Sequence, residues 1–394
     1  MRIVNSSSAR KSNLKVVLNC LRFNGSLSAS DIGALLNVPS GTVSRVSNYL
    51  LERKLIRVAK AKKNKSVGKP PIRLELNPDY ALIAGLELNE LSTNLLISDF
   101  KGKVLFKKSR PTTKSLDDLP LSLSELIESS VRELGLPDIS LKCVGIGVSG
   151  GVSNDNQKVM WSFLPKDYEL PRLLHEKLKV PVNIDNDANL AVIAEKMFGK
   201  GKTHENILCL LDRGWVGLGI YLNNQIYRGK NNAAGELLAH VSSGTNVAVG
   251  NLCRTPFIES FGLESMMRET GYIDVSKFPS RGKIIEFLSR RAEDNDSAAK
   301  NILENECIRF SEALFRLSVL FDPDLLVIAG DICSAGKLAE DNIKKMLAAK
   351  TAGISKVTPE FCFSCLEENN PVALGAAFLS IGKLTDSLIE NNCV

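Results

Sequence analysis

Four polar residues with short side chains stand together where an apolar stretch meets a helical pattern. Residues 182–195 are VNIDNDANLAVIAE, in which Asp185, Asn186, Asp187 and Asn189 follow the apolar start. Carboxylates accept hydrogen bonds, whereas side-chain amides both donate and accept them. A strand-to-helix junction with these groups could hold a ligand that carries donors and acceptors. The alternative is structural: Asp185 or Asn186 caps the helix and the other side chains are solvated.

A second group of chemically informative residues is basic and lies near the N-terminus. Residues 1–77 contain 15 Lys/Arg and 3 Asp/Glu, a net charge of +12. The remaining residues contain 35 Lys/Arg and 41 Asp/Glu, a net charge of −6. A basic segment attached to an acidic body predicts contact with a polyanion. The alternative is a solvated, disordered basic tail, but the helical patterning of the same residues argues against it.

The elements that would position the basic residues are three helices. Apolar residues recur at intervals of three and four, as expected when one face of a helix is buried. Ser28 and Asp31 resemble a capping pair for the second helix, and Ser40 can cap the third. The positions predicted to face the interior are Leu14, Val17, Leu18, Leu21, Ile32, Leu35, Leu36, Val43, Val46 and Leu50.

The third predicted helix leaves a polar face uncovered near its start. Small and hydrogen-bonding side chains there suit a major groove, where bulky residues would clash. Two short β-like runs, residues 55–59 and 72–76, flank a lysine-rich tip that could neutralise phosphates. We predict DNA contacts from Ser40, Gly41, Thr42, Ser44, Arg45, Asn48, Lys62, Lys63, Lys65 and Lys69.

Three helices, a β-wing and the charge of +12 predict a winged helix-turn-helix over residues 1–77. Its partner would be a double-stranded DNA operator. The alternative is a winged helix that docks on another protein.

After Tyr80 the pattern changes to strands. ALIAGLELN, STNLLISDF and KVLFKKS are three successive strand-like runs, and a helical pattern follows over residues 116–134. ENILCLLDRG and WVGLGIYLNNQIYRG begin the same pattern again about 125 residues later. A repeated β-β-β-α start predicts a duplicated α/β domain with a cleft between its halves.

Several stretches of this body resemble the ROK family of repressors, open reading frames and sugar kinases. Among them are GIGVSGGV, NIDNDANLAVIAEKMFG, AGELLAH, FDPDLLVIAGD and ALGAAFL, and together they span most of residues 80–382. The resemblance implies an actin-like, hexokinase-type fold of two lobes over residues 78–394, with a sensor and dimerisation role. The basic N-terminal segment is similar to the repressor branch of the family.

The resemblance also implies roles for the opening residues. In this family the Asn-Asp-Ala-Asn junction holds sugar hydroxyls, and the Asp deprotonates the hydroxyl that attacks ATP. Asn186 and Asp187 occupy those places, and Glu236 and Glu259 match two further sugar-binding carboxylates. A carboxylate accepts hydrogen bonds from two hydroxyls, so these residue types fit a sugar. His240 lies one place beyond the family's zinc- and ligand-contacting His and is kept as a candidate ligand residue.

The zinc site departs from the family pattern. The family combines its His with a Cys-x-Cys-Gly-x-x-Gly-Cys cluster, whereas the matching GNLCRTPFIES has only Cys253. One His and one Cys cannot complete a tetrahedral site, so no metal is predicted.

The phosphate loops depart from the kinase pattern as well. Kinases of the family resemble Asp-x-Gly-Gly-Thr-Lys at the first hairpin, where backbone N–H groups approach the phosphates closely. Here residues 87–92 are ELNELS, and the second loop, residues 212–215, is DRGW. Both glycines of the first loop are absent, and Glu90 adds negative charge. We therefore predict no ATP binding, no catalytic residues and no cofactor.

Composition sets further limits. No apolar run reaches 18 residues, so no transmembrane helix is expected, and the first residues lack the apolar core of a signal peptide. Nine cysteines are scattered along the chain without a framework. We interpret them as reduced thiols in a cytoplasmic protein, with Cys362 and Cys365 in the core.

These features predict a cytoplasmic repressor of carbohydrate-utilisation genes whose kinase-like body senses a sugar or sugar phosphate, without a membrane. A homodimer or higher homo-oligomer is expected, because winged helix-turn-helix proteins usually read two half-sites. Two alternatives stay open. One is an active ATP-dependent sugar kinase with an appended DNA-binding head, and the other is a repressor whose body senses a protein partner.

Overall fold

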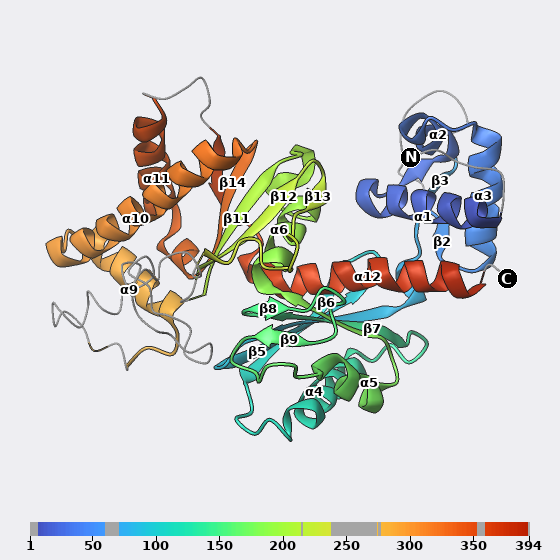
Figure 1. Cartoon of the computed structure of the whole chain (residues 1–394), viewed down its shortest axis with the longest axis horizontal. Helices are drawn as coiled ribbons and strands as arrows, with labels where there is room; N and C mark the ends of the chain where they lie inside the picture. The colour runs from blue at the N-terminus through green and yellow to red at the C-terminus, as the bar shows by residue number, and fades with distance from the viewer. Residues whose placement is uncertain are drawn as a thin grey trace.

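Three parts follow one another along the chain in the computed structural model, which describes residues 7–59, 71–213, 216–237, 274, 277–352 and 359–392. Figure 1 shows a blue N-terminal unit, a cyan and green lobe and a yellow to orange lobe, with the red helix α12 running between them. We call them the head, lobe I and lobe II.

The head consists of three helices and a small antiparallel sheet. The helices are α1 (Ser7–Asn24), α2 (Ala29–Leu36) and α3 (Ser40–Glu52). The strands pair in the order β1-β3-β2 and are β1 (Leu27–Ser28), β2 (Ile56–Val58) and β3 (Arg73–Leu76). The two predicted wing strands are therefore β2 and β3, and the wing tip, residues 60–70, lies outside the described residues.

The helix starts in the head follow the sequence only in part. The capping box of α2 is confirmed, because Ser28 and Asp31 each accept a hydrogen bond from the other's backbone N–H. Ser40 does not cap α3, since Pro39, whose φ is −55°, takes the N-cap position and Ser40 already belongs to the helix. Leu35 is 59% exposed rather than buried. Ile32 and Leu36, one helical turn apart, form the face of α2 that packs into the core of the head, and Leu35 lies off that face.

Lobe I is built on a five-stranded sheet in the order β10-β7-β4-β5-β6. Helices α4 (Leu119–Leu134) and α5 (Leu170–Leu178) cover one face of this sheet, and α12 (Pro371–Asn392) covers the other. A small hairpin of β8 (Gly151–Val152) and β9 (Val159–Trp161) follows β7. The strands of the sheet are β4 (Leu82–Leu88), β5 (Ser92–Asp99), β6 (Val104–Pro111), β7 (Leu141–Val148) and β10 (Val182–Asn186).

Lobe II has a second five-stranded sheet in the order β13-β12-β11-β14-β15. Helices α9 (Arg281–Glu293), α10 (Ser297–Phe321) and α11 (Gly336–Thr351) cover its outer face. Helix α6 (Asp187–Met197) packs on the inner face beside α12. The strands are β11 (Ile207–Asp212), β12 (Val216–Leu222), β13 (Gln225–Ile226), β14 (Leu325–Gly330) and β15 (Glu360–Phe363).

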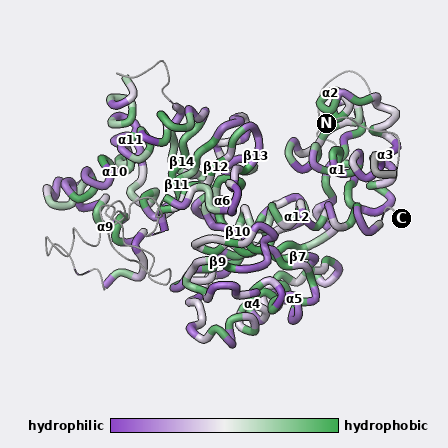
Figure 2. Tube along the Cα trace, in the orientation of Figure 1, coloured by the Kyte–Doolittle hydropathy of each residue, from purple (hydrophilic) through white to green (hydrophobic). Residues whose placement is uncertain are grey.

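The two sheets repeat the same plan. In lobe I, β4 is antiparallel to β5 and parallel to β7, which is parallel to β10. In lobe II, β11 is antiparallel to β12 and parallel to β14, which is parallel to β15. The repeated strand pattern of the sequence therefore corresponds to a structural duplication. Figure 2 shows β11 and β14 in hydrophobic green, with purple hydrophilic stretches on the outer helices.

Helix α12 lies directly on the sheet of lobe I because glycines leave room for its backbone. A Cβ atom at Gly85 or Gly145 would collide with the carbonyls of Ala373 or Ala376, and one at Gly375 would collide with the carbonyl of Leu190 in α6. The helix is long and apolar enough by composition to cross a membrane, and 67% of that window is buried inside the protein. That burial is the property of a core helix.

The head has no separate core. Leu14, Leu18 and Leu50 of the head belong to the same buried cluster as Ala377 and Ile381 of α12. The sequence predicted a head over residues 1–77, but its apolar faces are completed by the helix at the other end of the described chain. Cys362 is half-buried in β15, whereas Cys365 is exposed, because it lies in the loop after that strand; its predicted place in the core was wrong.

Candidate ligand site and nucleic-acid interface

The first half of α3 presents the predicted DNA-facing side chains to solvent. Val43, Val46 and Leu50 are buried against the rest of the head. The remaining positions form the opposite face: Ser40, Gly41, Ser44, Arg45 and Asn48 are exposed, and Thr42 is half-buried. The sequence pattern thus predicted correctly which face of α3 is buried, and the small residues at the helix start leave room for a groove. Lys62, Lys63, Lys65 and Lys69 lie outside the described residues.

Two arginines at the base of the wing are engaged inside the protein. Arg57 Nε lies 2.9 Å from Glu75 Oε1, and its Nη1 lies 2.9 Å from Asp79 Oδ2. Arg73 Nη1 lies 3.4 Å from Asp31 Oδ2. Part of the head's positive charge is therefore neutralised locally, and the predicted phosphate contacts fall on the wing tip.

At the β10–α6 junction, Asn186 is both a helix cap and a neighbour of the candidate ligand residues. Its Oδ1 accepts a hydrogen bond from Asn189 N at 3.0 Å, which caps α6. Its Nδ2 donates to the carbonyl of Gly150 at 3.0 Å and lies 3.5 Å from Glu236 Oε1. The capping alternative is thus correct for Asn186, and the same side chain also places the junction beside Glu236.

Asp185 has a structural partner. The Arg228 guanidinium donates two hydrogen bonds of 2.6 Å to its two carboxylate oxygens, and Asp185 is only 1% exposed. Arg228 Nη1 also lies 3.4 Å from Asn232 Oδ1. This bidentate pair fixes the end of strand β10 immediately before Asn186.

Asp187 is the residue whose protonation is most altered at the junction. Removal from bulk water, together with the nearby Glu87 and Glu236 carboxylates, raises its pKa to about 7, although the N–H of Ala188 and Arg213 favour the charged form. Asp187 Oδ1 accepts the Ala188 hydrogen bond at 2.8 Å. A carboxylate with this pKa is partly protonated at neutral pH, so it can both donate and accept hydrogen bonds to hydroxyls.

Trp161 is a site residue that sequence reasoning missed. Burial raises the pKa of Glu236, while a hydrogen bond from the Trp161 side chain lowers it. The indole lies against Gly151, where any Cβ would collide with the ring, and Gly150 has a φ of +114° that favours glycine. The sequence feature that could have indicated this residue is the glycine pair after β7. The pair leaves room for the indole and directs the Gly150 carbonyl to Asn186.

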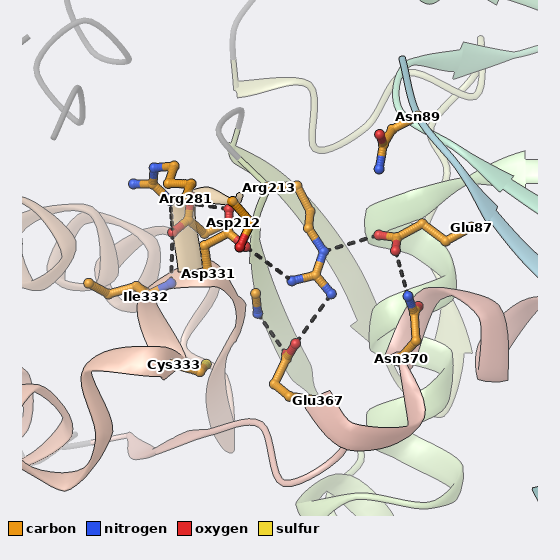
Figure 3. Close-up of polar contacts among 12 residues, drawn as sticks. Glu87, Asn89, Asp212, Arg213, Arg281, Asp331, Ile332, Cys333, Glu367 and Asn370 are labelled. Atoms are coloured by element: carbon orange, nitrogen blue, oxygen red, sulfur yellow. Dashed lines mark hydrogen bonds and ion pairs between the residues drawn. The ribbon is translucent and has the colours of Figure 1, made fainter. Parts of the chain in front are cut away.

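A network of ion pairs joins the two lobes beside this junction (Figure 3). Arg213, at the end of β11, points from lobe II toward lobe I. Its Nε lies 3.0 Å from Glu87 Oε1, Nη2 lies 3.2 Å from Glu367 Oε2 and Nη1 lies 3.8 Å from Asp331 Oδ1. Although burial opposes its charge, the Glu87 and Glu367 carboxylates raise the pKa of Arg213. Arg213 therefore remains a half-buried, paired cation.

The carboxylates around Arg213 are held from several sides. Asn370 Nδ2 donates to Glu87 Oε2 at 2.5 Å, and Gly330 N donates to Glu367 Oε1 at 2.7 Å. Asp212 receives Arg281 Nη1 at 2.5 and 2.6 Å and the N–H of Ile332 at 3.0 Å. Burial and the Asp212 carboxylate raise the pKa of Asp331 to about 6, while both arginines lower it.

This arrangement is unsuited to a bound triphosphate. Two arginines face four carboxylates, namely Glu87, Asp212, Asp331 and Glu367, so the described side chains of this network carry no excess positive charge. The β4–β5 turn is closed by Asn89, whose Oδ1 accepts hydrogen bonds from the N–H groups of Leu91 and Ser92. Those donors are therefore already satisfied and cannot also bind phosphate oxygens.

Two candidate ligand residues, and the one cysteine that matches the family's metal cluster, lie beyond what the structure describes. These are Glu259, His240 and Cys253. Within the described residues, no group of three or more His, Cys, Asp or Glu side chains is placed to hold a metal ion.

Two lobes with the same strand order, joined through α6 and α12, define a kinase-type α/β fold. The chain belongs to the ROK family, whose model matches residues 83–383. Among its relatives, a xylose repressor of Bacillus subtilis (strain 168) is 23% identical over 98% of this chain and all of its own length. The DNA-binding transcriptional dual regulator NagC of Escherichia coli (strain K12) is 24% identical, with 93% of each chain covered.

Solved structures give the same fold. A ROK family transcriptional regulator, a homologue of the E. coli MLC protein, superposes with a TM-score of 0.76 over 98% of each chain at 18% identity. A ROK family glucokinase from Streptomyces griseus, in complex with glucose and AMPPNP, has a TM-score of 0.63 at 19% identity. It covers 76% of this chain and 99% of its own. The regulator therefore matches nearly the whole chain, whereas the kinase leaves about a quarter unmatched.

Proposed function

We propose that the chain is a sugar-responsive, DNA-binding transcriptional repressor without kinase activity. The observation that carries the second half of this proposal is Arg213, whose guanidinium lies between Glu87 of lobe I and Glu367 and Asp331. The guanidinium lies between the β4–β5 hairpin and the β11–β12 hairpin. A kinase of this fold would have to hold phosphates with these two hairpins. The full-length match to repressors supports the first half.

In this proposal residues 1–77 are the DNA-binding unit, a winged helix-turn-helix. The exposed start of α3 enters the major groove and reads bases through Arg45 and Asn48. Lysines 62, 63, 65 and 69 of the wing neutralise phosphates. Ser40, Gly41, Thr42 and Ser44 let the helix approach the DNA closely.

Residues 78–394 are the sensor, and a sugar binds at the β10–α6 junction. Asp187 and Glu236 accept hydrogen bonds from its hydroxyls, Asn186 supplies the amide, and Trp161 orients Glu236. Glu259 and His240 complete the set as further proposed contacts. An uncharged sugar fits better than a sugar phosphate, because the arginines near the junction, Arg213 and Arg228, are already paired with carboxylates.

The protein acts in the cytoplasm as a homodimer or higher homo-oligomer, which pairs two heads on an operator with two half-sites. The sugar binds one arrangement of the lobes better than another and so changes the relative placement of the heads. Xylose is the first sugar to test, since xylose repressors are among the relatives.

One observation favours the kinase alternative. Asp187 has a pKa of about 7, a value suited to a general base that deprotonates a sugar hydroxyl. The test must therefore include phosphoryl transfer as well as binding.

Three measurements on the full-length protein test the proposal. In vitro selection from random double-stranded DNA should yield a sequence with two half-sites. Thermal-shift screening of neutral aldoses, beginning with D-xylose, and of their phosphate esters should find a stabilising ligand, and that ligand should change operator binding. ADP release with the same sugars should stay at background. Sugar-dependent ADP release would establish the kinase alternative, and a ligand-insensitive operator complex would favour a protein effector.

A further inference from the structure

The base of the wing is joined to lobe I through Glu75. This residue lies on β3 directly opposite Arg57 of β2, and its side chain is 11% exposed. One carboxylate oxygen accepts from Arg57 Nε at 2.9 Å, and the other accepts from Lys101 Nζ at 2.7 Å. Lys101 belongs to the turn between β5 and β6 of lobe I. Although burial opposes the charge, the hydrogen bonds from Lys101 and Arg57 lower the pKa of Glu75, so the carboxylate stays ionised and paired on both sides.

The β5–β6 turn holds Lys101 in a fixed position. Asp99 Oδ1 accepts hydrogen bonds of 2.9 Å from the N–H groups of both Lys101 and Lys103. Gly102, between them, has a φ of +85°, and a Cβ atom there would collide with the ring of Phe198. Glycine therefore allows a tight turn that lies directly against the protein. The Lys101 side chain thus reaches the head from a well-defined backbone.

The short connection between β3 and β4 is bonded to both the head and lobe I. Asn77 N donates to the carbonyl of Leu55 at 3.0 Å, and Asn77 Nδ2 donates to the carbonyl of Lys54 at 2.8 Å. The ring of Tyr80 lies 4.9 Å from that of Phe100 of lobe I. Phe100 is fully buried in the cluster that lobe I shares with the head. The connection therefore has the contacts of a core segment rather than those of a flexible linker.

A second attachment joins the head to α12. Lys15 of α1 lies 3.3 Å from Asp386 and 3.0 Å from Glu390, and Lys11 Nζ donates to the carbonyl of Glu390 at 3.0 Å. Figure 1 shows α1 lying along the C-terminal half of α12. Because glycines of the lobe I sheet leave room for α12, both attachments lead to the same lobe. The carboxylates on α12 are more than half exposed, so water screens these pairs more than the pair at Glu75.

We propose that Lys101 is a positioning residue for the head: through Glu75 it fixes the two wing strands on lobe I, so that the head and lobe I move as one body. Lys101 belongs neither to α3 nor to the wing tip. The value of a fixed orientation for reading an operator rests on the proposed function, whereas the attachment itself does not. A ligand that changes the placement of the heads would then act by moving lobe I, and the connection between β3 and β4 would not bend.

Hydrogen–deuterium exchange of the full-length protein, without DNA or ligand, tests the attachment. Lys101→Met should accelerate exchange of residues 73–81 about threefold or more, because a charged hydrogen bond is lost. The effect is smaller than for a fully buried bond, since the Lys101 side chain is 35% exposed. The bond from Arg57 remains, so Glu75 is not left unpaired and the variant should fold. Peptides from α10 and α11 serve as an internal reference.

Two further variants separate positioning from charge. Lys101→Arg keeps a cation that can donate to Glu75, so exchange should stay slow. Lys103→Met removes the same charge from the same turn, but Glu75 is paired with Arg57 and Lys101 instead, so this control should also exchange as the wild type does. Unchanged exchange in Lys101→Met, or equal acceleration in Lys101→Met and Lys103→Met, would overturn the attachment.

The spacing of operator half-sites tests whether the attachment positions the head. One base pair inserted between the half-sites of a selected operator shifts them by about 3.4 Å and rotates them by about 34°. The wild type and Lys103→Met should lose affinity about tenfold, comparable to one mismatched base pair, because fixed heads cannot follow the shift. Lys101→Met should lose clearly less, and Lys101→Arg should restore the full loss.

An unchanged spacing penalty in Lys101→Met, despite faster exchange, would overturn the positioning role. A wild type that tolerates the insertion would overturn the fixed head. If selection yielded no operator with two half-sites, the proposed function would fail, and the exchange experiment would still decide whether Lys101 fixes the head on lobe I.

Discussion

The Arg228 guanidinium makes two hydrogen bonds of 2.6 Å to the carboxylate of Asp185, immediately before the proposed ligand residues Asn186 and Asp187. The carboxylate is fully buried, and the arginine is about a quarter exposed. The pair therefore fixes the end of β10 without contacting the ligand itself, and its removal should affect stability first.

Arg228→Met should destabilise the protein by about 2–3 kcal/mol. Breaking a fully buried pair costs about 3–5 kcal/mol because one charge is left unpaired, and the partial exposure of Arg228 reduces that value. The measurement is urea denaturation at neutral pH. Arg172→Met, at a solvent-exposed pair, should destabilise the protein much less, because water screens that interaction. Equal effects of the two variants would contradict a structural role for the Asp185 pair.

Asp187→Asn should abolish the ligand response and leave operator binding intact. Loss of a hydrogen bond to a charged group costs about 1.5–3 kcal/mol, or about 10- to 150-fold in affinity. The head does not include this residue, so the unliganded protein should bind its operator normally. Operator binding is measured with and without the stabilising sugar. A normal response in the variant would make Asp187 a structural residue and place the sensor site elsewhere.

The same variant should show a pH-dependent gain in stability. The pKa of Asp187 is about 7 in the folded protein against a usual value of 3.8, so the folded state binds the proton more tightly. Protonation of Asp187 therefore adds to the free energy of unfolding below about pH 4, and this contribution is lost as the pH rises through 7. Asp187→Asn removes the penalty, so its melting temperature should exceed that of the wild type by more at pH 8 than at pH 5. A constant difference between the two pH values would show that Asp187 has no raised pKa.

Trp161→Phe should weaken sugar binding more at pH 6 than at pH 8. Phenylalanine keeps a ring against Gly151 but lacks the N–H that donates to Glu236. Because that hydrogen bond lowers the pKa of Glu236, its loss raises the pKa and leaves less carboxylate at the lower pH. Affinities at both pH values, measured by calorimetry, test this. An equal loss at both would indicate that Trp161 only fills space.

Lys62→Ala combined with Lys63→Ala should weaken binding to all DNA sequences alike. Removing one lysine–phosphate interaction should lower the slope of log affinity against log salt by about 0.9. Arg45→Ala is the matched comparison, since it should relax base preference at a cost of about 1–3 kcal/mol. Anisotropy titrations at several salt concentrations separate the two effects. A wild-type affinity that does not depend on salt would refute phosphate binding by the wing.

The sequence predicted local features well because their causes are local. The capping box at Ser28 and the buried face of α3 follow from residues a few positions apart. The duplicated sheet also follows, since each strand-like run carries its own pattern. The prediction that Ser40 caps α3 was wrong because Pro39, the preceding residue, is the N-cap and makes no side-chain capping hydrogen bond.

The candidate site could be predicted only where its residues lie on one segment. Asn186 and Asp187 were found because they are adjacent. Arg213 pairs with Glu87 and Glu367, which lie 126 and 154 positions away, and no periodicity connects such residues. Trp161 was missed for the same reason, since its partner Glu236 is on another segment and its own surroundings have no strong pattern.

The shared core of the head and α12 gives synthesis of the chain a particular order of events. Leu14 and Leu18 leave the ribosome about 360 residues before Ala377 and Ile381, which cover them in the folded protein. At 5–20 residues per second this interval is roughly 20–70 s. During that time the head exposes the apolar surface that α12 later buries. If the head is the DNA-binding unit proposed above, its core is complete only after the proposed sensor lobes have been synthesised.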